Sequence, residues 1–128
     1  TKTGYKSQNA TNNPSMTTDD HFTIPQWIGR FIMDNGDVYL SDFEKFKKIC
    51  IFASQTIKVT KEENKKLSLQ TSIIAEIDGI NTFIETPMKD KYHKAGILLW
   101  GDKEGYVDEF PIPIPQEILD YEEQFLKK

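Results

Sequence analysis

The chain has 128 residues and a formal net charge of −4 at pH 7. This length is ordinary for one domain that buries its own core, and the acidic balance argues against a broad electrostatic grip on duplex nucleic acid. A single cysteine, Cys50, excludes an internal disulfide, and no apolar run approaches the roughly 18 residues of a membrane helix. We expect a cytoplasmic protein with no membrane partner, and secretion without disulfides is the open alternative.

The N-terminal residues are rich in Thr, Asn, Ser and Lys and contain almost no large apolar side chain. A segment of this composition buries too little apolar surface to offset the entropy lost on ordering. We therefore predict a flexible arm over residues 1–20, followed by a single α+β domain over residues 21–128.

Residues 22–34 allow two structures. Apolar side chains recur there at helical spacing, Pro25 suits a first helical turn, and Asn35-Gly36 suits the end of a helix. The same letters also allow a hairpin around Asn35-Gly36. We favour the helix and expect Asp37–Leu40 to be extended in either case.

A capping-box sequence at Ser41–Glu44 predicts a helix over residues 42–54, with Cys50 buried on its apolar face. Residues 56–60 follow as a short strand. The charged run Lys61–Lys66 is predicted to be a solvated loop.

The clearest pattern in the chain is a β-hairpin over Ser72–Glu85. Asp78-Gly79 is a preferred pair for a two-residue type I′ turn, and the flanking residues alternate as strands require. We expect this hairpin to lie centrally in the sheet with both faces covered, and the open alternative is that Ile74 and Phe83 belong to a binding surface. The predicted cross-strand pairs are Ile77 with Ile80, Ala75 with Thr82, Ile73 with Ile84, and Ile74 with Phe83.

Residues 87–94 are polar and are expected to form a connection. Residues 95–100 and 105–110 predict a second hairpin around a glycine-containing turn. Residues 110–115 alternate proline with apolar residues, and since proline cannot donate to a ladder we expect an extended edge segment. Residues 116–128 predict a terminal helix with acids in its front half and lysines at its end.

Together these elements predict an α+β fold. Its sheet would be curved and antiparallel, with four to six strands and a small closed barrel as one form. Two or three helices, including the C-terminal helix, would cover it.

Catalytic and metal-binding chemistry finds little support. His21 and His93 are the two histidines, and neither has a second histidine or a cysteine at ligand spacing. The sequence contains no nucleophile elbow and no phosphate-binding glycine loop. We predict no metal, no cofactor and no enzymatic activity; the remaining enzymatic hypothesis uses His93 with Asp90 or Tyr92.

The leading hypothesis is a non-catalytic protein–protein interaction domain of the inhibitor, immunity or assembly-subunit type. Its basis is an acidic surface, an acidic terminal helix and an extended proline segment, which could suit a basic protein partner. The residues expected to contact that partner are Trp100, Tyr106, Phe110, Asp120 and Glu123.

The alternative is a five-stranded oligonucleotide-binding barrel. Such domains hold single strands by stacking bases on aromatic rings while lysines follow the phosphates. The residues expected to bind nucleic acid are Phe83, Tyr106, Lys61, Lys65 and Lys66.

Overall fold

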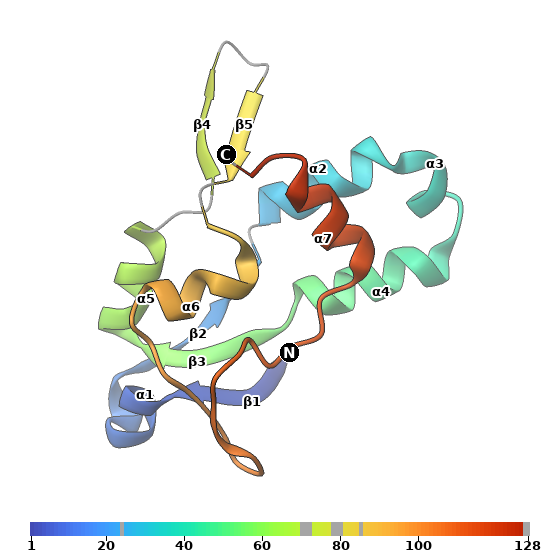
Figure 1. Cartoon of the computed structure of the whole chain (residues 1–128). Coiled ribbons are helices and arrows are strands. Elements are labelled where there is room, and N and C mark those ends of the chain that lie inside the picture. The colour runs from blue at the N-terminus through green and yellow to red at the C-terminus, as the bar shows by residue number, and fades with distance from the viewer. Residues whose placement is uncertain (24, 70–72, 78–80, 85, 127–128) are drawn as a thin grey trace.

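The computed structural model describes residues 1–23, 25–69, 73–77, 81–84 and 86–126 (Figure 1). Its main sheet has five strands in the order β2-β3-β1-β6-β7 and is not closed into a barrel. The α+β class predicted from the sequence is confirmed. The sheet is mixed rather than antiparallel, because β1 pairs parallel with β3. The strands are β1 Lys2–Ser7, β2 Thr17–His21, β3 Thr56–Thr60, β6 Leu99–Gly101 and β7 Gly105–Val107.

Helices in the described residues outnumber the two or three that we predicted. Several are short and lie in segments whose sequence resembles a loop. Within the described residues, none is both long enough and apolar enough to span a bilayer. The helices are α1 Gln8–Asn12, α2 Pro25–Asp34, α3 Gly36–Tyr39, α4 Phe43–Ala53, α5 Lys61–Leu69, α6 Lys91–Lys94 and α7 Gln116–Glu123, with 3-10 turns η1 Pro14–Met16 and η2 Met88–Asp90.

The N-terminal segment differs most from its prediction. Instead of a flexible arm, residues 1–20 contribute the middle strand β1, which pairs with β3 on one side and β6 on the other. Main-chain and hydroxyl bonds hold it: the hydroxyl of Thr3 donates to the carbonyl of Thr56 at 2.8 Å. Composition alone misjudged this segment, because a central strand is ordered by hydrogen bonds to both neighbours as well as by apolar burial.

The helices α2 and α4 confirm two predictions. The extended structure expected over Asp37–Leu40 is wrong, because α3 forms there and brings the buried ring of Tyr39 to 5.1 Å from that of Phe31. The cap of α4 is Asp42 rather than Ser41, since the Asp42 carboxylate accepts the amide of Lys45. Cys50 is exposed, so its predicted burial is also wrong.

The charged run Lys61–Lys66 is helical, which corrects the predicted loop. Thr60 and Glu63 form a capping box: the amide of Thr60 donates to Glu63 Oε1 at 2.9 Å, and the amide of Glu63 donates to Thr60 Oγ1 at 3.0 Å. This T-x-x-E pattern is a helix-start signal that the sequence reading missed.

The predicted hairpin exists as β4 Ile73–Ile77 and β5 Asn81–Ile84. It forms a separate two-stranded sheet that projects from the rest of the chain (Figure 1), so its expected central position is wrong. The pairs Ile73–Ile84 and Ile74–Phe83 are confirmed, whereas Ile77 pairs with Asn81 instead of Ile80. The turn at Asp78-Gly79 and the burial of the hairpin side chains lie outside the described residues.

The C-terminal part follows its prediction more closely. The polar connection contains η2 and α6, and the second hairpin is confirmed in the shorter form of β6 and β7. After the proline segment, Pro115 is the N-cap of the confirmed helix α7.

The core lies between the sheet and its helices. Figure 1 shows α5, α6 and α7 on one side of the sheet. Ile57 and Val59 of β3 are fully buried on that side. A cluster of aromatic rings continues the core into the helices; it includes Phe22, Trp27, Phe31, Phe52 and Tyr121.

Candidate binding surfaces

A groove of about 470 Å³ lies between η2 and α6, the strand β7 and the beginning of α7. We call it the β7 groove. Two of its apolar side chains are strongly exposed, Leu98 at 45% and Tyr106 at 50%. Its other apolar lining comes from Ile97, Leu99, Val107, Phe110, Ile112, Ile114 and Leu119.

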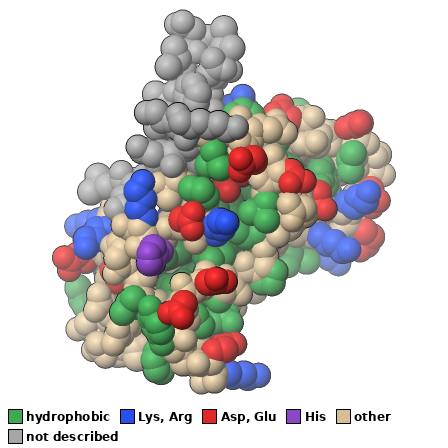
Figure 2. Space-filling view, viewed as in Figure 1, with side chains coloured by type: hydrophobic (Ala, Val, Ile, Leu, Met, Phe, Trp, Pro, Cys, Tyr) green, Lys and Arg blue, Asp and Glu red, His purple; other side chains and the backbone are tan. Residues whose placement is uncertain are grey.

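The rim of the β7 groove is mainly acidic. Asp90, Asp108 and Glu109 are exposed there, against the cations or potential cations Lys89 and His93. In Figure 2, the face that carries α6 and α7 shows hydrophobic side chains with acidic side chains around them. The groove therefore combines apolar contact area with a negative border.

The core fixes the segment after β7. The ring of Phe110 lies 5.0 Å from Phe22 and stacks at 6.1 Å on Tyr92. Pro111 and Pro113 carry no amide hydrogen, so at these two positions the segment cannot donate a backbone hydrogen bond to a bound chain. β7 is an edge strand of the described sheet, with β6 on its inner side.

A buried polar cluster supports the groove from behind. The hydroxyl of Tyr92 donates to Asp20, and Lys91 Nζ lies 3.9 Å from Asp20 Oδ2. Burial raises the pKa of the Asp20 carboxyl, which Lys91 partly opposes, and lowers the pKa of the Lys91 ammonium. Burial also raises the pKa of the Tyr92 hydroxyl, and the negative charge of Asp20 adds to that effect. These groups satisfy one another inside the protein.

The structure shows where the residues of the enzymatic hypothesis lie. His93 and Asp90 both lie on the β7 groove, whereas the hydroxyl of Tyr92 is engaged by Asp20. In the described part of the chain, no three His, Cys, Asp or Glu side chains group closely enough to hold a metal ion.

The opposite face of the sheet carries a second surface. The strand register places five side chains in one line across the sheet, because Asp19 pairs with Lys58, Lys58 with Lys6, Lys6 with Trp100, and Trp100 with Tyr106. All five are exposed or half-buried. We call Asp19, Lys58, Lys6, Trp100 and Tyr106 the open-face row.

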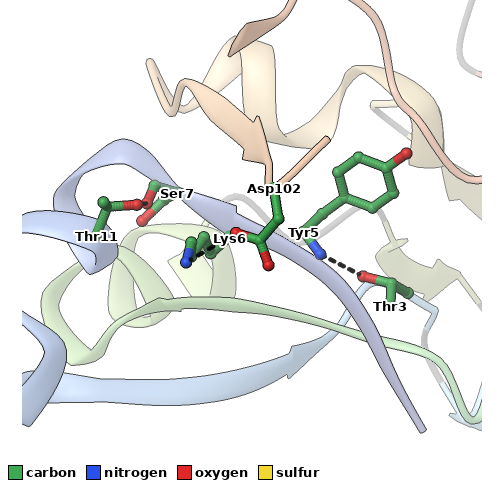
Figure 3. A network of polar contacts seen from close by, with 6 residues as sticks. All are labelled: Thr3, Tyr5, Lys6, Ser7, Thr11 and Asp102. Atoms are coloured by element: carbon green, nitrogen blue, oxygen red, sulfur yellow. Dashed lines mark hydrogen bonds and ion pairs between the residues drawn. The ribbon is translucent and has the colours of Figure 1, made fainter. Parts of the chain in front are cut away.

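A hollow of about 280 Å³ adjoins the lysine end of this row. It is lined by Lys2, Lys6 and Lys58, with Asp19 and Asp102 as its carboxylates. Figure 3 shows Asp102 leaning from the β6–β7 turn toward Lys6 on β1, and their Oδ1 and Nζ atoms lie 3.3 Å apart.

The five residues predicted to bind a protein do not form one surface. Tyr106 and Phe110 line the β7 groove, and Phe110 is half-buried against the core. Trp100 lies beside Tyr106 in the open-face row. Asp120 lines another groove between α3, α4 and α7, and Glu123 is exposed on α7.

The predicted nucleic-acid residues are also separated. Lys61, Lys65 and Lys66 are exposed on α5, which contacts β2 and β3, whereas Tyr106 lies on β7 at the far edge of the sheet. The side chain of Phe83 lies outside the described residues.

The predicted site residues include neither Lys58 nor Lys6, the two lysines at the middle of the open-face row. Lys58 could have been found, because it alternates with Ile57 and Val59 in a predicted strand and must point to the opposite face. Lys6 could not, since its segment showed no strand pattern.

Comparisons with known proteins give no family assignment: no family model, no curated protein and no solved structure matches the chain.

Proposed function

We propose that this protein is a non-catalytic module that binds a partner protein through the β7 groove. The observation that carries this proposal is the pair of exposed side chains Leu98 and Tyr106 beside a groove of about 470 Å³. Large apolar side chains exposed together beside a concave surface are typical of interaction sites.

The acidic rim indicates the character of the partner. Three exposed carboxylates face one lysine and one histidine at the groove, so a segment with lysine or arginine beside its apolar residues would be favoured. Because β7 is an edge strand, an extended segment could also pair with its backbone. An inhibitor, immunity or assembly-subunit role would use such a surface to bind its partner.

A cytoplasmic location belongs to the same proposal. It fits the exposed thiol of Cys50, because unpaired exposed thiols persist best in reducing compartments.

A displayed library of random peptides tests the proposed function with the full chain as bait. We expect enrichment of peptides that combine large apolar residues with Lys or Arg. Leu98→Ala and Tyr106→Ala should each weaken the selected peptides about tenfold or more, as loss of a central contact does. An Asp108→Asn, Glu109→Gln variant should reduce the preference for basic residues.

Phe43→Ala is the matched control, because Phe43 is 71% exposed on α4, outside the groove lining. It should leave peptide binding unchanged. A library without enrichment, or peptides that lose affinity with Phe43→Ala but not with Leu98→Ala, would refute the proposal.

A further inference from the structure

We propose that the open-face row is a second binding site, for a short stretch of single-stranded nucleic acid. This inference does not depend on the β7 groove, although Tyr106 belongs to both surfaces. It rests on which side chains the strand register aligns.

The strand register sets the geometry of the row. Lys58, Lys6, Trp100 and Tyr106 come from the four neighbouring strands β3, β1, β6 and β7. Neighbouring strands are about 4.8 Å apart, so these four side chains span about 14 Å of one sheet face. The flanking row of Ser7, Leu99 and Val107 is turned toward the interior, with Ser7 and Leu99 buried.

One end of the row is aromatic. Trp100 remains 39% exposed and Tyr106 50% exposed, although both belong to paired strands. A Cβ atom at Gly105 would lie 3.6 Å from Trp100 Cη2, so the indole borders the space that a side chain at this position would occupy. Gly105 also has a φ of +74°, a conformation that glycine adopts without strain. The hairpin thus fixes an exposed aromatic platform, and bases stack on such platforms with little sequence preference.

The other part of the row is cationic. Lys6 and Lys58 follow the aromatic pair in the row, and Lys2 lines the same hollow. Lysines beside a stacking platform are placed to follow the phosphates of the strand whose bases are stacked. A peptide could also bind to the aromatic rings. Only an acidic peptide would gain binding energy from the lysines as well.

The carboxylate of Asp102 lies beside the cationic part of the row. Asp102 competes with a phosphate for Lys6, since the two side chains are ion-paired at 3.3 Å. The Asp102 side chain is largely exposed on a turn, so exposed-pair energetics apply and the pair opens at little cost. A phosphate could therefore replace Asp102 as the partner of Lys6.

The experiment uses the full chain and oligonucleotides of about 16 nucleotides, the upper end of what one small domain covers. Oligo(dT) and oligo(U) are titrated while tryptophan fluorescence is recorded. The chain has two tryptophans, and Trp27 is buried, so quenching reports on Trp100. The logarithm of affinity should fall with the logarithm of salt concentration with a slope of about −2, the value for three phosphate contacts.

Five variants locate the site. Trp100→Ala and Trp100→Phe lack the reporting tryptophan, so their binding is measured by the fluorescence anisotropy of an end-labelled oligonucleotide. Trp100→Ala should weaken binding about 5- to 160-fold, the loss expected for one stacked base, and Trp100→Phe should restore part of it. Lys6→Ala and Lys58→Ala should each reduce the salt slope by about 0.7. Asp102→Asn should strengthen binding, because it releases Lys6.

The matched control removes three lysines elsewhere. A Lys61→Ala, Lys65→Ala, Lys66→Ala variant of α5 should bind almost normally, as should Leu98→Ala in the β7 groove. Absence of quenching at low salt overturns the proposal. It is also overturned if the α5 variant loses more affinity than Lys6→Ala, or if poly-glutamate competes as well as the oligonucleotides, since the face would then bind polyanions or acidic proteins in general.

Discussion

The buried carboxylate of Glu63 connects two helix starts, and its removal is the sharpest test of the fold. Glu63 Oε1 accepts the hydroxyl of Ser7 at 2.5 Å and the amide of Thr60 at 2.9 Å. Glu63 Oε2 lies 3.3 Å from Asn9 Nδ2. Ser7 in turn caps α1 by accepting the amide of Ala10. One side chain therefore holds the start of α5 against the end of β1.

We expect Glu63→Ala to lower the free energy of unfolding by about 3–6 kcal/mol. Each of the two shorter bonds involves a charged acceptor, and such bonds contribute about 1.5–3 kcal/mol. The longer bond from Asn9 adds little. Glu63→Gln keeps an oxygen for the amide of Thr60 but loses the charge, so it should cost about 1–2 kcal/mol.

Urea unfolding monitored by circular dichroism measures these differences, provided that the slope m is unchanged. Glu62→Ala is the control on the same helix, because Glu62 is exposed and should change stability by less than about 0.5 kcal/mol. A cost below about 1 kcal/mol for Glu63→Ala would show that the carboxylate does not join the two helix starts.

Three further predictions concern side chains at other places in the fold. Unfolded tyrosine loses its proton above about pH 10, whereas burial raises the pKa of Tyr92. The free energy of unfolding should therefore fall above pH 10 by up to about 1.4 kcal/mol per pH unit from this group, and Tyr92→Phe should remove that part of the slope in urea titrations. The exposed thiol of Cys50 should react with a thiol reagent in the folded protein as fast as in urea, and slow labelling that requires urea would refute its exposure. Gly29→Ala should stabilise α2 by about 0.5–1 kcal/mol, because nothing lies within 4 Å of the added Cβ. A Cβ at Gly101 would instead lie 2.7 Å from the ring of Tyr5, so Gly101→Ala should lower the stability of the protein. Thermal melts of the two variants measure both effects.

Local signals predicted the elements whose structure depends on their own residues. The helices α2, α4 and α7 and both hairpins follow from apolar period, capping residues and turn residues. The position of the first hairpin did not follow, because its alternation fits a central strand pair as well as a projecting one. The strand β1 was missed for a related reason: its order comes from bonds to β3 and β6, which are distant in sequence.

The candidate surfaces were only partly predictable. Tyr106 was predicted to be a binding residue, and it is exposed and lies at both surfaces. Phe110 is also an aromatic residue in a similar context, yet its ring packs on Phe22 and Tyr92. Alternation along the sequence cannot distinguish the exposed Tyr106 from the packed Phe110, because the chain leaves the sheet after Val107. Beyond that residue the two-residue period of a strand no longer applies. The alignment of Lys6 with Trp100 depends on pairing between β1 and β6, which no local pattern predicts.

The shared position of Tyr106 links the two proposals physically. A peptide in the β7 groove and a strand stacked on the open-face row would both contact this side chain, which has one ring and one rotamer at a time. Their binding should therefore be coupled, and by linkage each ligand must change the affinity of the other by the same factor. Titrating the oligonucleotide with and without a selected peptide measures that factor. In Tyr106→Ala the factor should approach one, even where both ligands still bind weakly. A factor of one in the unaltered protein would show that the two surfaces do not meet at Tyr106.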